Sequence, residues 1–325
     1  MSSSFAVEVN NIKREYTTRD FFGRIKGVNT ALKGISFNIK EGELFGVIGP
    51  NGAGKTTTIK ILSTLLTQTS GEAFVLGLDV RKEIYEIRKR IGIVFGGERG
   101  LYNRVTAVEN LRYFAGLYGV SSTVSKQRIP ELIEMVGLKG RENEKVEKYS
   151  RGMKQRLHIA KALINDPEMV FLDEPTIGLD PAGSRDIRDM IRDMKKEGKT
   201  ILLTTHYMFE ADELCQRIAV ISKGNIVALD KPSELKKQVK DVTLVELQVY
   251  GATEDFLNRI KGMEGVSKVY SDLEGERQMI RIQTPIGGEL IPEIRKLSGD
   301  FRTKIIETNV REPTLEDAYL RMVEE

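Results

Sequence analysis

The sequence has one cysteine, two histidines, no tryptophan and no long hydrophobic run. The single cysteine, Cys215, excludes an internal disulfide framework and is typical of a reducing compartment. So few thiols and imidazoles also argue against a structural zinc cluster. Apolar runs such as 169–172 and 201–203 fall far short of the roughly 18–20 residues that a membrane helix needs. Because the first residues also lack a secretion signal, we expect a soluble, intracellular chain that reaches a membrane only through a partner.

A strong excess of one charge sign is also missing. Fifty Lys and Arg residues against 47 Asp and Glu leave a net charge of +3, which argues against a dedicated nucleic-acid binder. Nine prolines and the absence of low-complexity runs argue against a disordered or fibrous chain. Apolar residues make up 40% of the sequence, enough for a sizeable core. A length of 325 residues corresponds to two average domains.

The first part of the chain alternates predicted strands and helices. Alternating patterns predict strands near 7–9 and 35–39, with the polar segment 17–30 as a loop or hairpin insertion. The apolar run 44–48 predicts a buried strand that leads into a helix. Later strands and helices are predicted at 169–172, 183–197, 200–205, 210–216 and 218–222. This order predicts an α/β fold with a mostly parallel sheet and helices on its faces.

Two further regions differ from this pattern. Helical spacing dominates 107–165, which predicts a helical subdomain at about 100–165, inserted within the sheet. From about residue 240 the predicted order is β-α-β-β-α-β with a last helix near 314–323, which is typical of a small ferredoxin-like module. We therefore expect one domain over 1–235 and an α+β module over 240–325.

A glycine-rich loop follows the predicted strand 44–48 and opens a helix. It comprises Gly49, Pro50, Asn51, Gly52, Ala53, Gly54, Lys55 and Thr56, and it matches the phosphate-loop pattern in full. Its glycines let backbone N–H groups turn toward an anion without a Cβ in the way, and the helix N-terminus points at the same anion. Lys55 would reach the β- and γ-phosphates, and the Thr56 hydroxyl would ligate Mg²⁺.

Two acidic residues and a histidine follow other strands of the same predicted sheet. The buried strand 169–172 leads into Asp173 and Glu174, at the edge where parallel sheets bind ligands. Asp173 would hold Mg²⁺, and Glu174 would accept a proton from an attacking water. His206 follows the strand 200–205, where it would hydrogen-bond a γ-phosphate. A histidine at a strand end is by itself more often structural than catalytic.

The segment 149–156, Tyr-Ser-Arg-Gly-Met-Lys-Gln-Arg, resembles the signature motif of ABC-type ATPases. Asp180 resembles a residue of the loop that follows their catalytic glutamate. Tyr16 resembles the aromatic residue that stacks on adenine, and Thr57 matches the residue beside the α-phosphate. The resemblance covers roughly residues 5–235 and five ordered motifs.

The resemblance implies a P-loop ATPase core that uses ATP and Mg²⁺. It also implies a head-to-tail dimer, homodimeric or heterodimeric, in which Ser150 and Gly152 cap the γ-phosphate held by the other subunit. The partners would be separate transmembrane permease subunits, so the chain would lie peripherally on the inner face of the cell membrane. The signature and the tail 312–319 resemble single-domain subunits of the daunorubicin-resistance and sodium-extrusion exporters.

The sequence departs from this family at two places. In the signature, Tyr149, Arg151 and Met153 replace the usual Leu, Gly and Gln. The Gln that usually follows the strand 91–95, where it helps to ligate Mg²⁺ and senses the membrane partner, is replaced by glycine whether counted to position 96 or 97. We expect weakened rather than absent turnover, because Mg²⁺ commonly keeps several waters.

Alternatives remain open at this point. A soluble ABC ATPase acting on ribosomes or DNA is one, although the chain has one phosphate loop and no sustained heptads. A regulatory ATP-binding switch without useful turnover is another, suggested by the missing Gln. Leu101, Tyr102, Phe114 and Tyr118 would line a groove for the membrane partner, or belong to the core, as we expect for Phe114 and Leu111. The C-terminal module, which has no catalytic constellation, would support dimerisation or regulation.

Overall fold

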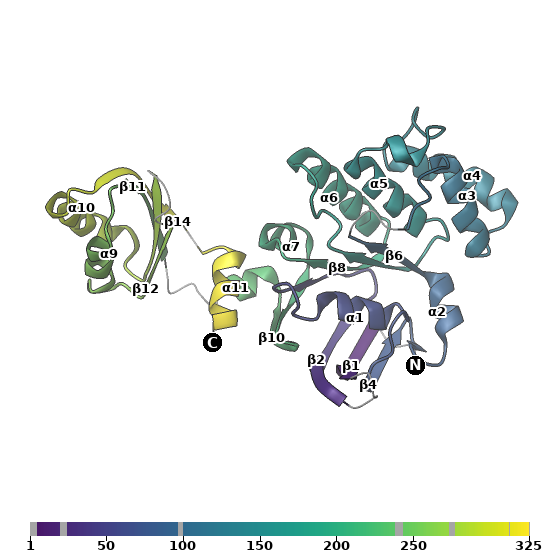
Figure 1. Cartoon of the computed structure of the whole chain (residues 1–325), viewed down its shortest axis with the longest axis horizontal. Coiled ribbons are helices and arrows are strands. Elements are labelled where there is room, and N and C mark those ends of the chain that lie inside the picture. The colour runs from purple at the N-terminus through teal and green to yellow at the C-terminus, as the bar shows by residue number, and fades with distance from the viewer. Residues whose placement is uncertain are drawn as a thin grey trace. The chain divides into compact units, whose positions relative to one another are not determined.

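The chain forms two compact units, Met1–Pro232 and Ser233–Glu325, and each is described by itself. The structure, a computed structural model, describes residues 5–19, 25–96, 100–237, 243–272, 277–311 and 313–324 (Figure 1). None of the helices in these ranges has both the length and the apolar composition that crossing a membrane requires.

The central element of the first unit is a sheet of six strands. In spatial order these are β10 (Asn225–Asp230), β9 (Arg217–Ser222), β3 (Leu44–Ile48), β8 (Thr200–Thr205), β7 (Met169–Asp173) and β6 (Ile91–Phe95). All neighbours are parallel except β10, which runs antiparallel to β9. Strands β3, β7 and β8 are buried along their whole length, which is consistent with the apolar runs 44–48, 169–172 and 201–203 within them. The predicted parallel sheet is confirmed.

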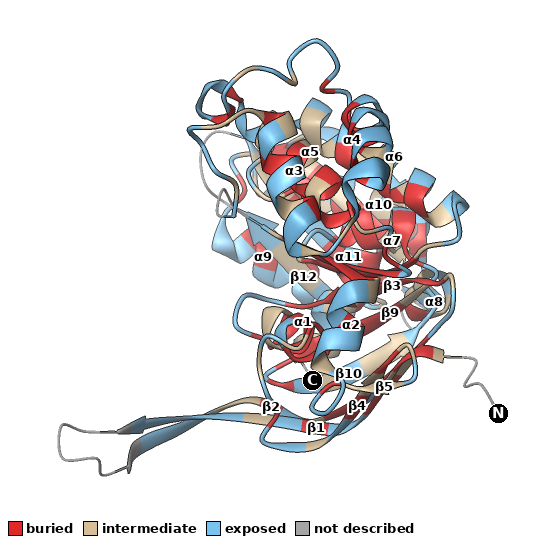
Figure 2. Ribbon diagram, turned by 90° about the vertical axis from the view of Figure 1, so that its right-hand side faces the viewer, coloured by how far each residue is buried: buried red, intermediate tan, exposed pale blue. Residues whose placement is uncertain are grey.

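A second sheet of the first unit is antiparallel. Its strands, in spatial order, are β2 (Ile25–Lys40), β1 (Phe5–Arg19), β4 (Ser70–Val75) and β5 (Leu78–Asp79). Strands β1 and β2 pair from Phe5–Lys40 to Arg19–Ile25, so the hairpin projects as the long exposed arm in Figure 2. The loop predicted over 17–30 is therefore wrong for most of its length, while the predicted hairpin is correct.

Helices cover both faces of the central sheet (Figure 1). They are α1 (Lys55–Leu62), α2 (Ile84–Arg90), α3 (Ala107–Leu117), α4 (Ser122–Met135), the short 3₁₀ helix η1 (Val146–Lys148), α5 (Arg151–Ala162), α6 (Pro181–Lys196) and α7 (Met208–Leu214). Helices α3, α4 and α5 pack on one another and form the predicted helical subdomain. Side-chain caps fix the helix starts: Thr106 makes a capping box with Glu109, and Ser121 caps α4.

One hydrophobic cluster connects the two sheets of the first unit through α1. Phe45 of β3 stacks on Phe37 of β2 with ring centroids 5.3 Å apart. Ile59 and Ile61 of α1 are almost fully buried in the same cluster. Burying each such side chain stabilises the fold by about 2 kcal/mol. The start of α1 is thereby fixed beside the end of β3.

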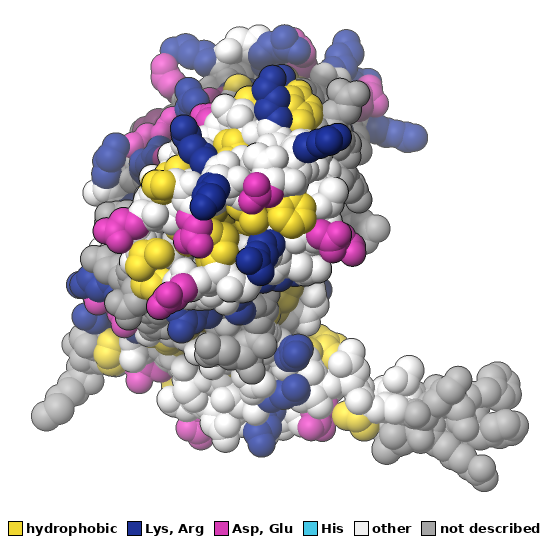
Figure 3. All heavy atoms as spheres, turned by 90° about the vertical axis from the view of Figure 1, so that its left-hand side faces the viewer, with side chains coloured by type: hydrophobic (Ala, Val, Ile, Leu, Met, Phe, Trp, Pro, Cys, Tyr) yellow, Lys and Arg dark blue, Asp and Glu magenta, His cyan; other side chains and the backbone are white. Residues whose placement is uncertain are grey.

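The second unit has its own sheet and core. Its antiparallel strands, in spatial order, are β12 (Lys268–Asp272), β13 (Gln278–Thr284), β11 (Thr243–Tyr250) and β14 (Lys304–Arg311). Helices α9 (Glu254–Lys261) and α10 (Ile291–Asp300) cover one face, while the 3₁₀ helix η2 (Gly287–Leu290), α8 (Pro232–Lys237) and α11 (Leu315–Glu324) complete the elements. This is the predicted β-α-β-β-α-β order of a ferredoxin-like module. On the face shown in Figure 3, charged side chains of both signs are interspersed.

Candidate functional site

The phosphate loop joins the end of β3 to the start of α1, as the sequence predicts. Gly52 and Gly54 have φ angles of 81° and 116°, which side chains other than glycine rarely adopt. A Cβ at Gly49 would lie 2.2 Å from the carbonyl oxygen of Ile221. The Lys55 ammonium is buried and donates to the carbonyl oxygens of Gly49 at 2.7 Å and Pro50 at 3.3 Å. The loop is therefore a glycine-dependent backbone cradle with a buried cation inside it.

Three predicted residues meet at the carboxyl edge of the parallel sheet. The Lys55 ammonium lies 3.1 Å from one carboxylate oxygen of Glu174. The other oxygen of Glu174 lies 3.3 Å from Nδ1 of His206. Lys55 begins α1 after the loop that follows β3, while Glu174 and His206 follow β7 and β8, and β8 lies between β3 and β7 in the sheet. A cation, a carboxylate and an imidazole thus lie together at this edge, a combination suited to phosphoryl transfer to water.

The predicted metal ligands provide oxygen donors. Asp173 ends β7, is 6% exposed and accepts a hydrogen bond from Thr204 Oγ1 at 2.5 Å. Thr56 lies in the first turn of α1 and is partly exposed. No group of three acidic, histidine or cysteine residues in the described ranges could enclose a metal by itself. A carboxylate and a hydroxyl near a phosphate cradle fit Mg²⁺, which keeps waters and takes further ligands from phosphates.

Tyr16 and Thr57 lie on different elements, β1 and α1. Tyr16 lies on β1 opposite Asn29 of β2, with 39% of its surface exposed and the Arg14 guanidinium 4.6 Å from its ring centre. The next part of β2 reaches the phosphate loop, because a Cβ at Gly54 would lie 2.6 Å from Leu32. Thr57 is partly exposed on the first turn of α1. The exposed Tyr16 ring has the apolar surface on which a base can stack.

The signature residues gather at a separate place. Ser150 caps α5 by accepting a hydrogen bond from the N–H of Met153 at 3.2 Å, and Asp180 caps α6 in the same way. Ser150, Gly152 and Asp180 line one pocket of about 440 Å³, and no residue of the phosphate loop is among its lining residues. The structure therefore brings these three predicted residues to one another and gives them a pocket distinct from the cradle.

Arg151, which replaces a usual glycine of the signature, contacts the loop before α6. A Cβ at Gly178 would lie 2.1–2.5 Å from the guanidinium atoms of Arg151. Gly178 also has a φ angle of 68°, so its backbone conformation favours glycine, whereas the guanidinium at the end of the flexible Arg151 side chain could move aside. The long Arg151 side chain thus packs against Gly178, which has no side chain.

Gly96, one of the two positions where the family usually has Gln, lies close to the backbone of both acidic residues. A Cβ there would lie 2.9 Å from the carbonyl oxygen of Glu174 and 3.1 Å from that of Asp173. A Gln at position 96 would therefore require a shift in the backbone of the acidic residues. The alternative position, 97, lies outside the described residues, as do 98, 99 and residue 312 of the tail.

Three residues beyond those predicted have unusual surroundings: His158 and Lys161 on α5, of which His158 is buried, and Thr204 on β8. Burial, assisted by the nearby Lys161 charge, lowers the pKa of His158 to about 4. Burial also lowers the pKa of Lys161 to about 8. The Lys161 ammonium lies 4.9 Å from the Phe114 ring centre and donates to the carbonyl oxygen of Gly100 at 3.3 Å. The only indication of these surroundings in the sequence was a basic residue, Lys161, on the apolar face of a predicted helix.

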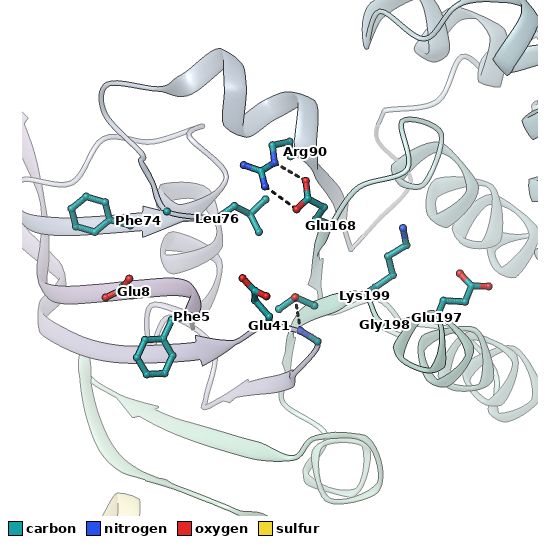
Figure 4. A pocket seen from close by; sticks show the side chains of 13 residues that line it. Phe5, Glu8, Glu41, Phe74, Leu76, Arg90, Glu168, Glu197, Gly198 and Lys199 are labelled. Carbon is teal, nitrogen blue, oxygen red and sulfur yellow. Dashed lines mark hydrogen bonds and ion pairs between the residues drawn. The ribbon is translucent and has the colours of Figure 1, made fainter. Parts of the chain in front are cut away.

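A larger pocket lies at the opposite edge of the central sheet. It has a volume of about 790 Å³ and includes Phe5, Phe74 and Leu76 in its lining (Figure 4). Arg90 and Glu168 make a bidentate ion pair across it at 2.6 and 2.8 Å. Since Glu168 and Thr200 lie at the amino ends of β7 and β8, this pocket is at the wrong edge to serve the phosphate cradle.

Comparison with known proteins identifies the family. A family model described as "ABC transporter" matches residues 32–177. The linearmycin resistance ATP-binding protein LnrL of Bacillus subtilis (strain 168) is 35% identical over 317 residues, which cover 97% of each chain. The chain belongs to the ABC transporter family. The predicted family and its ATP-hydrolysing character are thereby confirmed.

Other relatives and solved structures agree. The daunorubicin resistance ATP-binding protein DrrA3 of Streptomyces coeruleorubidus is 34% identical over 300 residues, covering 91% of this chain and 92% of that protein. A fluoroquinolones export ATP-binding protein of Mycobacterium tuberculosis (strain ATCC 25618 / H37Rv) is 46% identical over 211 residues, 65% of this chain and 68% of its own. A dimeric post-hydrolysis ATP-binding cassette bound to ADP and Pi superimposes with a TM-score of 0.62 and 29% identity, over 69% of this chain and 98% of that one.

Proposed function

We propose that this ABC ATPase powers an exporter and is docked on separate transmembrane subunits at the cytoplasmic face of a membrane. The contact among Lys55, Glu174 and His206 at the carboxyl edge of the sheet carries this proposal. The exporter assignment is supported by the names of relatives that resemble the chain over most of its length. Which molecule is exported would be decided by the membrane subunits.

Each predicted residue has a role in this proposal. Tyr16 stacks on adenine, and the phosphate loop with Lys55 and Thr57 holds the phosphates. Thr56 and Asp173 would hold Mg²⁺, which would neutralise phosphate charge. Glu174 orients and deprotonates the attacking water, and His206 hydrogen-bonds the γ-phosphate.

A second subunit completes the site in the proposed assembly. Ser150, Gly152 and Asp180 line a pocket that includes no phosphate-loop residue, so they are available to a nucleotide held by another copy. The N-terminus of α5, capped by Ser150, favours the negative charge of a terminal phosphate. The dimeric relative bound to ADP and Pi supports a paired arrangement, identical or not.

The helical subdomain has an aromatic cluster, Tyr102, Tyr113 and Phe114, suited to a membrane partner. Tyr102 and Tyr113 are each about half exposed, and their rings lie 4.9 Å apart. Phe114 is partly buried beneath them, whereas Leu111 is fully buried core. Exposed clustered aromatics are typical of protein interfaces. We propose that this aromatic cluster receives a cytoplasmic segment of the permease.

The two compact units suggest separate roles for the two parts of the chain. The proposed ATPase domain corresponds to residues 1–235 and contains every residue of the proposed site. The module over 240–325 would support dimerisation or regulate ATP-bound contacts. Within it, Arg311 pairs with Glu246 at 3.0 Å and with Asp317 at 2.8 Å, which connects β11, β14 and α11.

The test is ATP-dependent dimerisation of Glu174→Gln, which keeps the shape of the side chain but removes the carboxylate. Retained ATP should hold two copies together, so size-exclusion chromatography should show a dimer with ATP and a monomer without it. Glu197→Gln, a matched exposed residue at the opposite edge of the sheet, should hydrolyse ATP at the wild-type rate.

Two results would contradict the proposal. A Glu174→Gln variant that stays monomeric at saturating ATP would exclude the sandwiched dimer. Alternatively, wild-type protein tagged in its native cell could fractionate with ribosomes or nucleic acid instead of a polytopic membrane protein. Multiple-turnover phosphate release separates an energy-coupling ATPase from a switch that only binds ATP.

A further inference from the structure

Thr204 contacts both acidic residues of the site, although no sequence motif points to it. It lies near the carboxyl end of β8, directly beside Asp173 of β7 in the parallel pairing, and is fully buried. Its hydroxyl donates to Oδ1 of Asp173 at 2.5 Å. The N–H of Glu174 donates to the same hydroxyl oxygen at 3.2 Å and to the Thr204 carbonyl oxygen at 3.0 Å. One residue thus binds two consecutive acidic residues.

The Thr204 hydroxyl both donates and accepts a hydrogen bond. A threonine hydroxyl has one proton to donate and accepts through its oxygen lone pairs. The proton goes to the Asp173 carboxylate, at a distance typical of a charge-assisted O–H···O⁻ bond. In the described part of the chain no donor reaches the other carboxylate oxygen, Oδ2. Fixing Oδ1 therefore leaves Oδ2 as the oxygen that can face a cation.

The main-chain contacts act on Glu174. Its φ angle of 49° lies in the left-handed region, which is unfavourable for a side chain of this kind by roughly 1–2 kcal/mol. The two hydrogen bonds to Thr204 offset that cost and hold the peptide between Asp173 and Glu174 in one orientation. The direction of the Glu174 side chain, toward Lys55 and His206, depends on that peptide.

We propose that Thr204 is a positioning residue for hydrolysis, which sets the metal-facing oxygen of Asp173 and the backbone of Glu174 together. The proposal rests on the proposed ATPase function. Hydrogen-bonding partners behind metal ligands typically affect metal affinity or activity by 10–100-fold. Thr204 would never touch the nucleotide, so it acts through Asp173 and Glu174 alone.

The test compares Thr204→Val with Thr200→Val in the full-length chain. Thr200 is a buried threonine on the same strand, whose hydroxyl accepts from the N–H of Gly42 at the opposite edge of the sheet. Thr204→Val should raise the apparent Kd for Mn²⁺, measured by EPR in the presence of ADP, by about 10-fold. It should also lower kcat with Mg²⁺ by about 10-fold or more, while KM for ATP changes little. Thr200→Val should match wild type in all three.

A second pair of variants covers the case in which Thr204→Val does not fold. Thr204→Ser and Thr204→Ala differ only by the hydroxyl oxygen, and only the serine variant should retain wild-type Mn²⁺ affinity. Equal Mn²⁺ affinity in these two variants, or in Thr204→Val and Thr200→Val, would overturn the proposal. A wild-type protein that neither binds Mn²⁺ with ADP nor hydrolyses ATP would instead refute the proposed function.

Discussion

Single residues with unusual surroundings give the most specific expectations. His158 is 2% exposed on α5, and its Nε2 has no hydrogen-bond partner in the described ranges. Because burial disfavours the charged imidazole, its pKa falls from 6.5 to about 4 in the folded chain. The unfolded chain therefore binds the proton first as the pH falls. Stability linked to His158 is complete above about pH 6.5 and is lost as the pH approaches 4.

A variant isolates this contribution. Replacing His158 by Leu removes the titration and the unpartnered nitrogen, so the variant should lose less stability than wild type between pH 7.5 and pH 4.5. The difference between the two losses should be about 2–3 kcal/mol at most. Urea unfolding at both pH values measures it. An equal loss in the two proteins would assign the acid sensitivity to other groups.

The residues of the candidate site differ in how far the sequence alone predicts their neighbours. The meeting of Lys55, Glu174 and His206 could be predicted because the strands before the phosphate loop, Glu174 and His206 have locally encoded burial, and the carboxyl ends of parallel strands share an edge. Thr204 could not, because its role depends on β8 lying directly beside β7, a pairing that neither strand encodes alone. The obstruction at Gly96 is equally a product of tertiary contact.

At the scale of elements, the β1–β2 hairpin explains the error in the predicted loop. The described side chains of this segment, at 17–18 and 27–30, are polar or small and lie mostly exposed on the arm (Figure 2). A strand with no buried face shows no apolar alternation, so period-two reasoning has nothing to detect. Pairing along the hairpin still satisfies its backbone groups. Elements with one buried face, such as α3 and β11, could be predicted closely.

The aromatic cluster of the helical subdomain gives an expectation for docking. Tyr102→Ala combined with Tyr113→Ala should leave ATP hydrolysis by the isolated chain within about twofold, because neither ring belongs to the proposed site. Binding to the membrane protein that co-purifies with wild type should weaken by about 2 kcal/mol, roughly 30-fold, as for other interface aromatics. Quantitative pull-down in mild detergent measures this.

Tyr85→Ala is the matched control for that experiment. Tyr85 lies on α2 with 81% of its surface exposed, outside the cluster. Its replacement should leave both hydrolysis and co-purification unchanged. If the double variant co-purified as well as Tyr85→Ala, the cluster would not be the docking surface.

At the scale of the whole molecule, the two units each have their own sheet and hydrophobic cluster. A chain that ends after residue 240 retains both sheets of the first unit and its cluster, so it should fold cooperatively. At protein concentrations where the shortened chain still forms the ATP-bound dimer, its kcat should stay within about threefold of wild type, because no proposed catalytic residue is removed. Phosphate release and thermal melting are the measurements. Failure of the shortened chain to fold would show that the units are interdependent.

The ion pair between Lys55 and Glu174 has a consequence for ligand discrimination. Lys55 already has three oxygen partners within its own chain: two carbonyls of the loop and one carboxylate. A ligand that binds Lys55 must replace these oxygen partners. The binding free energy that it gains from Lys55 is therefore only the difference between its own contact and the contacts that are lost. We therefore expect the loop to favour ligands of high negative charge density, and a polyphosphate that contacts Lys55 would compete with Glu174 for the ammonium.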